Sequence, residues 1–476
     1  MSRHARIAIV GGGICGLSAA YHLDRIIRTK DRAWEARLFE EAPLLGGVIR
    51  TEIRDGFVMD LGPDALFKAK PAAENLAREI GLGDELVSAL PQKKPTMIYF
   101  RGRLHPLPEG LELMAPTRIL PLLGSGLLSS SGKLRMLMEP FIPARRDGTE
   151  ESIAQFVSRR FGPEALERIA GPLLAGIHAG DPARLSMTGT FPRLPEMERA
   201  HGSIARAIQK ARSANRTQPS GGAAPKGPPF LSLRRGLGAL VKRLESSVER
   251  VRLETGRGVR ILEKDGRGFR LRLLDGSSWE ADACVLCLPA GPAAAVLSEL
   301  DPGAARLAEG VRYASTAAAY LAYRDGESGF RLPPTSGFLI PPGEDTATFG
   351  CTFVSNKFPG RTPDGFFLIR AFLGGDLHLG AMELSDDQMI GSVRETLRKI
   401  LGLWQEPLFT KIQRWPRSNP QYEVGHAGRV RALFARLKAF PGLVLTGSGF
   451  LGVGVPDGVA LGQAAAREAD AFLAGA

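Results

Sequence analysis

Cysteine and histidine are scarce in this sequence, and each scarcity excludes a class of protein. The 476 residues contain four cysteines, too few for a disulfide framework, which predicts a reducing compartment. The seven histidines show no ligand spacing, so no metal site is expected. Cys284 and Cys287 form a C-x-x-C pair, but they lie in an apolar, strand-like segment without a second pair. We interpret them as core thiols.

Long apolar runs are also absent. A membrane-spanning helix needs roughly 18 or more uninterrupted apolar residues, and the closest approach, residues 111–128, is broken by Glu112, Pro116, Arg118 and Pro121. The chain is expected to lie on a bilayer at most, and not to cross it. Lys and Arg are not interleaved with aromatic residues in any run, so nucleic acid is not an expected partner.

What the chain does have is an excess of positive charge. Its 62 Lys and Arg against 50 Asp and Glu give a net charge of +12. This balance favours anionic partners such as dinucleotides, substrate carboxylates or anionic lipid, although a solvated basic surface explains it equally well. The length exceeds the ~250–300 residues at which single cores stop growing, so two or more domains are expected.

The first forty residues have a βαβ pattern. Residues 6–10 are a short, β-branched apolar run that ends in glycine, as in a buried parallel strand. Residues 16–27 carry small and apolar residues at helical spacing, and a second strand is predicted over 36–40. A glycine-rich turn therefore joins the first strand to the first helix.

This turn, residues 11–16, has the pattern G-x-G-x-x-G. Gly11 permits a tight turn, Gly13 lets a pyrophosphate approach the backbone, and Gly16 lets helix and strand pack closely. The helix N-terminus offers unpaired N–H groups to the phosphates. The pattern predicts a dinucleotide site formed by Gly11, Gly12, Gly13, Ile14, Cys15 and Gly16.

Two further features extend this site. Glu40 or Glu41 ends the second strand and is expected to accept the ribose hydroxyls; the gap from Gly11 is longer than the usual ~20 residues. Gly46 and Gly47 follow and allow a second close approach to the diphosphate. This combination is typical of FAD proteins of the glutathione-reductase type rather than of plain NAD binders.

Later segments alternate between helical and strand patterns. Residues 105–145, rich in Leu, Met and Pro, fit a membrane-facing or substrate-covering helical region, or an ordinary helical subdomain. Residues 211–229 are of low complexity and are predicted to form a flexible loop. We predict helices over 71–90, 150–180, 236–247 and 386–402 and from about Gly458, and strands over 250–280, 283–288, 310–375 and 442–447.

Four segments resemble a known family. They are MDLGPDAL (59–66), GPLLAGIHAGDPARLSM (171–187), WPRSNPQYEVGH (415–426) and GFLGVGVPDGVALG (449–462). In this order they resemble the flavin amine oxidase superfamily and, within it, the HemY-type protoporphyrinogen and coproporphyrinogen oxidases. Ile177, His178 and Gly458 depart from the family pattern.

The resemblance implies FAD as the cofactor. It adds the following residues to the cofactor site: Gly62, Pro63, Asp64, Ala65, Val259, Val453, Gly454, Val455 and Asp457. The glycines of the terminal motif leave the backbone free to reach the flavin. The positive end of the closing helix would then stabilise the reduced, anionic flavin.

The resemblance also implies an activity. A porphyrinogen, protoporphyrinogen IX or coproporphyrinogen III, would be oxidised to the porphyrin by hydride transfer to FAD, in three two-electron steps that release hydrogen peroxide from oxygen, in haem biosynthesis. No catalytic residue beyond the flavin is expected. Further implied partners are an anionic membrane surface, the next pathway enzyme (ferrochelatase) and a second copy of the chain. The implied location is cytoplasmic, at most peripheral on the inner face of the cell membrane.

By the same resemblance, the backbone from Gly176 to Ala179 would face the macrocycle, and Leu339 and Phe353 would sandwich it. The substrate propionates require a cation. Thr96 stands where plant and animal members have an arginine, and the substitutes considered are Arg101, which we assign to the pocket, and Lys93, Lys94 and Arg103.

The expected fold is α/β, with a discontinuous, Rossmann-like FAD-binding domain of the glutathione-reductase type, an α+β substrate domain and a helical subdomain that is a candidate for membrane association. The FAD domain comprises 1–92, 232–300 and 415–476. The helical region spans 93–195, and the substrate domain comprises 196–231 and 301–414.

Two alternatives stay open. The first is an amine oxidase or a carotenoid desaturase on the same scaffold. An amine oxidase should have an aromatic cage, yet residues 310–425 offer only scattered aromatics. The second is a non-catalytic flavin-binding scaffold protein.

Overall fold

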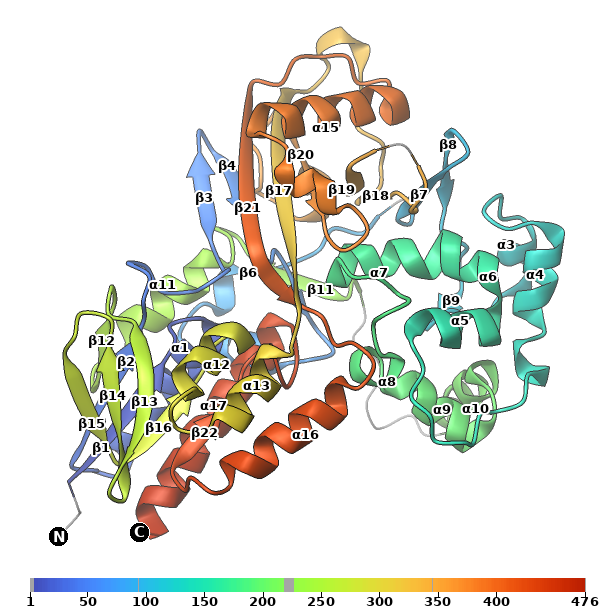
Figure 1. Cartoon of the computed structure of the whole chain (residues 1–476). Helices are drawn as coiled ribbons and strands as arrows, with labels where there is room; N and C mark the ends of the chain where they lie inside the picture. Colours follow the sequence, from blue (N-terminus) through green and yellow to red (C-terminus); the bar gives the residue numbers. More distant parts are fainter. Residues whose placement is uncertain (1–3, 93, 218–226, 345, 476) are drawn as a thin grey trace. The chain divides into compact units, whose positions relative to one another are not determined.

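The chain forms two compact units. The structure, a computed structural model, describes residues 4–92, 94–217, 227–344 and 346–475. Unit 1 comprises Met1–Ala89, Pro229–Arg312 and Gly428–Ala476, and unit 2 comprises Leu90–Pro228 and Tyr313–Ala427. Figure 1 shows the elements of both units coloured along the chain.

Unit 1 is built around a parallel sheet of five strands, whose order is β12-β2-β1-β16-β22. Its strands are short and apolar because helices and a second sheet cover both faces. The five strands are β1 (Ala5–Val10), β2 (Trp34–Phe39), β12 (Val251–Glu254), β16 (Ala283–Leu286) and β22 (Leu443–Leu445). They come from all three chain segments of the unit, and the fold is mixed α/β as predicted.

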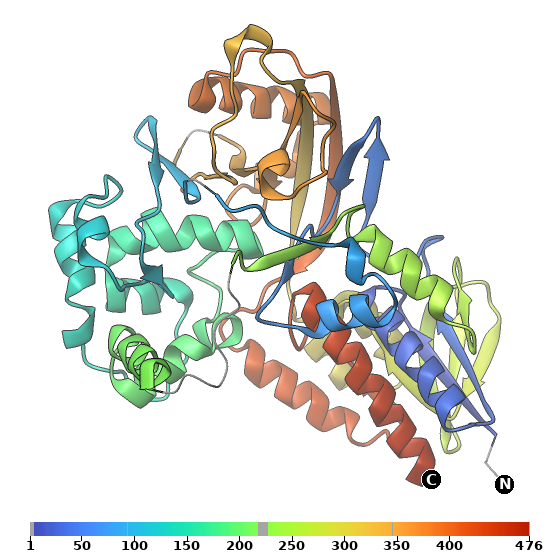
Figure 2. The ribbon, with the colours of Figure 1, turned by 180° about the vertical axis from the view of Figure 1, so that it is seen from behind.

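Helices and small sheets complete unit 1. The helices are α1 (Ile14–Thr29), α2 (Ala72–Glu79), α11 (Gly238–Ser247), α12 (Ala290–Leu297), α13 (Pro302–Glu309) and α17 (Val455–Gly475); α16 (His426–Leu437) begins at the unit boundary. The other strands are the hairpin β3 (Thr51–Arg54) and β4 (Phe57–Asp60), the sheet β5 (Leu66–Phe67), β11 (Phe230–Leu233) and β6 (Leu86–Ser88), and the sheet β13 (Val259–Asp265), β14 (Gly268–Leu273) and β15 (Ser278–Ala281). Figure 2 shows α2 next to α17, against which it packs.

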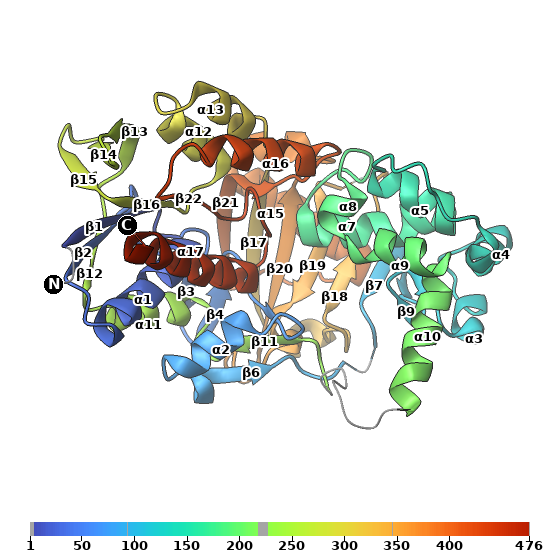
Figure 3. The ribbon, with the colours of Figure 1, turned by 90° about the horizontal axis from the view of Figure 1, so that it is seen from below.

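The first and last helices of unit 1, α1 and α17, lie side by side (Figure 3). Glycines at their contact allow a very close approach. A Cβ at Gly462 would overlap the Cys15 carbonyl oxygen, and one at Gly458 would lie 2.8 Å from Ile14 Cγ2. The Ser18 hydroxyl also donates a 2.8 Å hydrogen bond to the Val459 carbonyl. This contact fixes the two N-termini of the helices at one edge of the sheet.

Unit 2 contains a seven-stranded sheet of order β21-β17-β20-β19-β18-β7-β8. Its strands are β7 (Met97–Phe100), β8 (Arg103–Pro106), β17 (Tyr313–Arg324), β18 (Gly337–Leu339), β19 (Thr348–Phe353), β20 (Phe366–Gly374) and β21 (Phe409–Pro420). All neighbours are antiparallel except β18 and β7. The antiparallel sheet predicted over 310–375 is therefore present.

The two faces of this sheet differ. One face packs on α15 (Asp386–Leu401), and its buried side chains include Phe338, Cys351 and Phe353. Because side chains alternate along a strand, Leu339, Gly350 and Phe372 lie on the opposite face. At one end of this opposite face lies α7, since a Cβ at Gly176 would be 3.1 Å from Leu339 Cδ2.

The helical part of unit 2 has its own core. Its elements are α3 (Ile119–Leu123), α4 (Ser130–Leu137), α5 (Ile153–Phe161), α6 (Pro163–Ala165), α7 (Gly171–His178), α8 (Met187–Thr190), α9 (Arg193–His201) and α10 (Ile204–Thr217), with the strand pair β9 (Leu111–Glu112) and β10 (Ala115–Pro116); α14 (Val354–Lys357) lies elsewhere in unit 2. Residues 105–145 are thus only partly helical. The predicted loop 211–229 begins later than expected, because α10 continues to Thr217; residues 218–226 lie outside the described residues.

A buried ion pair holds this helical part together. The guanidinium of Arg160 bonds the Glu139 carboxylate, and neither side chain has exposed surface. Burial by itself would raise the pKa of Glu139, but hydrogen bonds from Ser203 and Arg160 lower that pKa overall. Glu139 therefore remains charged, and it also accepts the backbone N–H of Ile204 at 3.0 Å, which anchors α10.

Three expectations need correction. The helix predicted over 71–90 ends at Glu79, because Gly81 takes a left-handed φ of 81° and the chain then enters β6. The closing helix begins at Val455 and not near Gly458. The predicted domain boundaries also shift. Residues 415–420, predicted in the FAD domain, belong to β21 and pair with β17 in unit 2, and residues 302–309, predicted in the substrate domain, form α13 in unit 1.

The α1–α17 contact yields a prediction. In Gly462→Ala the new methyl group would overlap the backbone of Cys15, so the helices must separate, and we expect a loss of about 1–3 kcal/mol of unfolding free energy. Urea unfolding followed by circular dichroism measures it. The control is Gly391→Ala in α15, where a Cβ meets no described atom within 4 Å and removal of glycine should add roughly 0.5–1 kcal/mol. Equal shifts in the two variants would contradict this account.

Candidate cofactor site and substrate face

Two glycine turns meet at the N-terminus of α1. Gly13 is the N-cap of this helix and no side chain caps it. The Gly46 N–H donates to the Gly12 carbonyl at 2.7 Å, and a Cβ at Gly47 would lie 3.3 Å from Gly13 Cα. A Cβ at Gly13 would meet no described atom within 4 Å. The open space at Gly13 therefore faces unpaired helical N–H groups, as a pyrophosphate site requires.

The other glycines of the first turn have steric reasons to be glycine. Gly11 has a φ of 102°, and its Cβ would lie 2.6 Å from the Cys287 carbonyl oxygen. A Cβ at Gly16 would overlap the Gly11 carbonyl. The Arg50 guanidinium donates to the carbonyls of Leu44, at 3.1 Å, and Leu45, and so fixes the second glycine turn beside the first.

The structure distinguishes the two carboxylates that the sequence left open. Glu40 accepts hydrogen bonds from the backbone N–H of Gly12 at 2.5 Å and of Ala42 at 2.8 Å. Glu41 instead lies against Gly258. Glu40 is thus the carboxylate at the glycine turn, at the carboxyl end of β2, where ribose hydroxyls are bound in this class of fold.

Val259 is connected to Glu40 through a hydrogen bond between the two backbone segments. The Arg257 N–H donates to the Glu40 carbonyl at 2.8 Å, and β13 begins two residues later at Val259. Val259 is half-buried. The structure therefore places Val259 at the same end of the site as Glu40.

The second group of predicted cofactor residues surrounds the start of α17. Gly62, Pro63, Asp64 and Ala65 form the half-buried turn between β4 and β5, which packs against α17. Val453 and Gly454 directly precede α17, which begins at Val455. The Asp457 carboxylate accepts the Gly454 N–H at 3.0 Å. All the cofactor residues predicted from the sequence thus lie in unit 1.

One more residue near this site was not predicted. Thr446 follows β22, and its N–H donates to the Leu286 carbonyl at 2.9 Å. Its buried hydroxyl has no hydrogen-bond partner among the described residues, and a buried hydroxyl normally has one. The open cradle at Gly13, the Glu40 carboxylate, the two helix N-termini and this hydroxyl together fit a bound dinucleotide.

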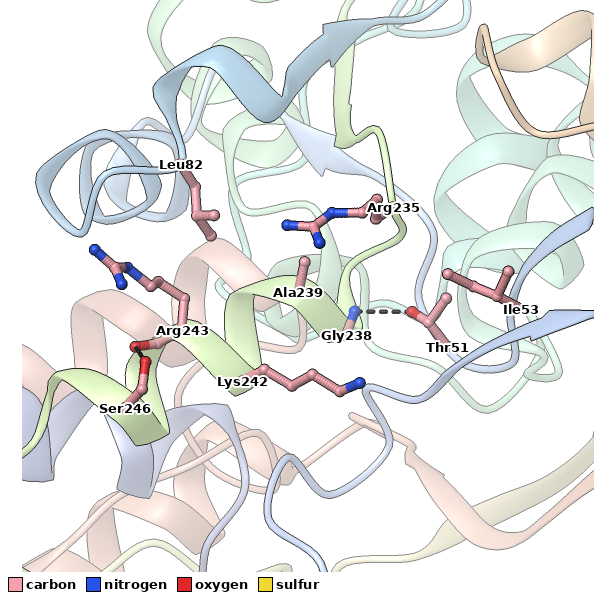
Figure 4. Close-up of a pocket in the computed structure, with 9 residues that line it drawn as sticks. All are labelled: Thr51, Ile53, Leu82, Arg235, Gly238, Ala239, Lys242, Arg243 and Ser246. Atoms are coloured by element: carbon pink, nitrogen blue, oxygen red, sulfur yellow. Dashed lines mark hydrogen bonds between the residues drawn. The ribbon is translucent and has the colours of Figure 1, made fainter. Parts of the chain in front are cut away.

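A separate basic hollow lies on α11 (Figure 4). Its volume is about 520 Å³, and it is lined by Thr51, Ile53, Leu82, Arg235, Gly238, Ala239, Lys242, Arg243 and Ser246. The Gly238 N–H donates to the Thr51 hydroxyl at 2.8 Å. None of the predicted cofactor residues lines this hollow, so it is not the dinucleotide site.

In unit 2, the family-like segments 171–187 and 415–426 pack on each other. The Gln421 amide donates to the His178 carbonyl at 3.0 Å, and the Ser186 N–H donates to the Tyr422 carbonyl at 2.8 Å. Ala179 ends α7 in a left-handed conformation, with φ at 52°. The 415–426 segment therefore shapes the end of α7, where Gly176 and Ala179 are predicted to face the substrate.

The predicted sandwich of Leu339 and Phe353 is not possible in this structure. Leu339 pairs with Gly350, whereas Phe353 shares its face with Cys351 and points into the core under α15, with no exposed surface. The two side chains therefore lie on opposite faces of the sheet. Phe353 is a core residue.

Phe372, and not Phe353, lies on the same face of the sheet as Leu339. Gly350 pairs with Leu339 on one side and with Phe372 on the other, so the row reads Leu339, Gly350, Phe372 across three strands. Gly350 has no side chain, and the Leu339 side chain covers it, since a Cβ at Gly350 would lie 2.9 Å from Leu339 Cδ2. Phe349 stacks on Phe372, with ring centroids 5.9 Å apart.

The described cations that were considered as carboxylate contacts are exposed in unit 2, and a buried arginine lies beside Phe372. Arg101 lies at the exposed tip of the β7–β8 hairpin, with a φ of 51°, and Lys94 and Arg103 are exposed as well. Lys93 lies outside the described residues. Arg370, which the sequence did not single out, is buried, and its guanidinium carbon lies 4.7 Å from the Phe372 ring centroid.

The cysteines are free and buried. Burial raises the pKa of Cys284, and a hydrogen bond with Cys15 together with burial raises that of Cys287. Such thiols are poor nucleophiles and poor ligands. In the part of the chain that the structure describes, no group of three or more His, Cys, Asp or Glu is placed to hold a metal ion. Within the same ranges, no helix is long and apolar enough to cross a membrane.

The parallel sheet, the paired glycine turns and the carboxylate at the end of β2 define a dinucleotide-binding oxidoreductase fold. The family of flavin-containing amine oxidoreductases matches residues 14–469. The chain belongs to this family, and its cofactor is FAD.

Relatives match along the whole length. Coproporphyrinogen III oxidase of Bacillus subtilis (strain 168) is 35% identical over 98% of both chains. Protoporphyrinogen oxidase 1, chloroplastic, of Arabidopsis thaliana is 30% identical over 96% of this chain and 85% of its own. A crystal structure from Exiguobacterium sp. 255-15 superposes with a TM-score of 0.85 at 28% identity, covering 98% of this chain and 99% of its own.

The open space at Gly13 yields a prediction that separates folding from cofactor binding. A methyl group in Gly13→Ala meets no described atom, so the apoprotein should keep its unfolding free energy to within about 1 kcal/mol. The same methyl group occupies the pyrophosphate space, so the affinity for FAD should fall by more than about tenfold. Flavin fluorescence titration measures the affinity.

Gly12→Ala is the control, because its Cβ would lie 2.9 Å from Glu40 Cβ and must disturb the fold itself. Unchanged FAD affinity in Gly13→Ala would show that the phosphates lie elsewhere.

Proposed function

We propose that this chain oxidises coproporphyrinogen III to coproporphyrin III in haem biosynthesis. One observation carries the proposal: the coproporphyrinogen III oxidase of Bacillus subtilis matches 98% of the chain at 35% identity. The apolar row on the sheet face of unit 2 supports a flat, largely apolar substrate. Protoporphyrinogen IX is the second candidate. It is supported by the plant protoporphyrinogen oxidase, whose identity to this chain, 30%, is lower than that of the Bacillus enzyme.

The chemistry is supplied by the cofactor. FAD, when bound, would supply the two-electron chemistry, and molecular oxygen is proposed as the final acceptor with release of hydrogen peroxide. The chain's own residues hold and orient the cofactor. Gly13, Gly47 and the N–H groups of α1 hold the diphosphate, Glu40 the ribose, and the N-terminus of α17 provides positive potential. Three such oxidations give the conjugated porphyrin.

The substrate side needs shape and charge rather than an acid–base pair. We propose that Leu339 and Phe372, which lie on one face of the sheet, contact the macrocycle from the same side. The backbone at Gly176 and Ala179 bounds the same face. Arg370, which lies on Phe372, is our candidate for a propionate contact, because a guanidinium suits a carboxylate best.

The test is a porphyrin fluorescence assay with both porphyrinogens, run beside oxygen consumption. Wild-type protein with FAD should oxidise coproporphyrinogen III faster than protoporphyrinogen IX. Phe372→Ala removes one apolar contact of the substrate and should raise KM by about tenfold, which corresponds to roughly 1.4 kcal/mol. Oxidation of an amine or a carotenoid in place of porphyrinogens would favour the alternatives on this scaffold, and no turnover at all would favour a non-catalytic flavoprotein.

Phe353→Leu is the matched control for Phe372→Ala. It changes a core side chain on the opposite face, so it should lower the unfolding free energy by about 1 kcal/mol and leave KM unchanged. A raised KM in Phe353→Leu with none in Phe372→Ala would contradict the assignment of the faces.

We further propose that the helical part of unit 2 rests on an anionic membrane surface at the inner face of the cell membrane. Large apolar side chains are exposed around α3 and α4, with Leu120 at 80% and Phe141 at 77% exposure. Monomeric soluble proteins rarely expose such patches without a binding role. The apolar patch consists of Leu113, Ile119, Leu120, Leu123, Leu134, Met138 and Phe141. Lys133 lies within the same stretch of chain and supplies positive charge, whereas the nearby Arg118 is paired with Glu109 at 3.6 Å.

Vesicle flotation tests this surface. The double variant Leu120→Ser, Phe141→Ser should bind vesicles that contain phosphatidylglycerol at least about tenfold more weakly than wild type, because two inserted apolar side chains are lost. Trp404→Ser is the control, since Trp404 is 71% exposed but lies after α15, outside the patch. Equal binding of wild type and double variant would refute the membrane proposal.

Two further partners belong to the same proposal. The porphyrin product would pass to a ferrochelatase as the next haem-pathway enzyme, and a second copy of the chain is proposed as a homodimer partner. Both rest on the family resemblance of the four signature segments.

A further inference from the structure

An ion pair joins two segments of unit 1 that are distant in the chain. Lys70 lies in the turn between β5 and α2, and Asp457 in the first turn of α17. The Lys70 ammonium lies 2.8 Å from both carboxylate oxygens of Asp457. The lysine side chain is 53% exposed, and exposed pairs contribute only about 0–1 kcal/mol to stability. Stability therefore gives little reason for this pair.

Asp457 has a defined structural task. Its carboxylate accepts the Gly454 N–H at 3.0 Å, directly before the first turn of α17. This hydrogen bond orders the glycine-containing backbone that precedes the helix. A carboxylate at a helix N-terminus is favourable for the helix, because it meets the positive end of the dipole.

The same carboxylate is unfavourable for an anion bound in front of the helix. The N-termini of α1 and α17 adjoin, since a Cβ at Gly458 would lie 2.8 Å from Ile14 Cγ2. Ligands of parallel α/β sheets bind outside the carboxyl ends of the strands, which is the edge where both helices begin. A flavin there gains negative charge on reduction, and an uncompensated Asp457 would oppose that charge.

We propose that Lys70 is a charge-compensating positioning residue of the flavin site. It neutralises Asp457, so that α17 keeps its cap and still presents a positive terminus to the reduced cofactor. The proposal rests on the proposed function only in that FAD is bound at this edge. Lys68, two residues earlier, has a different partner, because its ammonium donates to the Ser88 hydroxyl at 3.2 Å.

The test measures the reduction potential of bound FAD and the dissociation constant of sulfite, which adds to oxidised flavin and leaves a negative charge on the ring. Lys70→Met should weaken sulfite binding by about tenfold and lower the two-electron potential by about 30 mV, the equivalent of that factor. Asp457→Asn should shift both quantities in the opposite direction. Asn keeps an oxygen that can accept the Gly454 N–H.

The double variant Lys70→Met, Asp457→Asn should return both quantities close to the wild-type values, because the two charges are removed together. Lys70→Arg keeps the charge and should also resemble wild type. Lys68→Met is the matched control from the same turn and should change neither quantity. Effects on potential should weaken as salt is raised.

Three outcomes would overturn the proposal: an unchanged potential in Lys70→Met with FAD bound, no cancellation in the double variant, or a raised KM for porphyrinogen without any shift in potential. The last outcome would make Lys70 a substrate contact. All flavin readouts are made without porphyrinogen. A wild-type protein that binds FAD but oxidises no porphyrinogen would therefore refute the proposed function and leave the Lys70 proposal open to the same measurements.

Discussion

The close packing of α1 on α17 is the constraint on which the cofactor site depends. Gly458 and Gly462 remove the side chains that would hold the two helices apart, and Ser18 bonds across the contact. The first helix provides the diphosphate cradle at Gly13, and the last helix provides the terminus capped by Asp457. Residues from distant parts of the chain therefore meet at this contact, and the proposed site depends on van der Waals packing between the two helices.

A second constraint is the pleat of the sheet in unit 2. Alternation along β18, β19 and β20 sends one set of side chains under α15 and the other set to the opposite face. The first set stabilises the unit, and the second set forms the face on which we propose that the substrate binds. Leu339, Gly350 and Phe372 therefore differ in task from Phe338, Cys351 and Phe353, although the two sets are interleaved in the sequence.

The cofactor half was largely predictable because its signals are local. The glycine spacing from Gly11 to Gly16 and the strand–helix context can be read from contiguous residues, whereas the choice of Glu40 over Glu41 depends on the exact end of β2. The substrate half was less predictable because strand register is not local. The face on which each side chain lies follows from the pairing of β18 with β19 and of β19 with β20, so no sequence pattern could show that Phe372 and not Phe353 shares the face of Leu339.

The order of elements along the chain has a consequence for biosynthesis. Because α17 follows every other described element, a ribosome delivers it after all of them. Until then, the face of α1 that it covers lacks this partner, and the proposed flavin site is incomplete. A message cut short within this helix would therefore yield a product without the full α1–α17 contact, in which we expect no bound flavin.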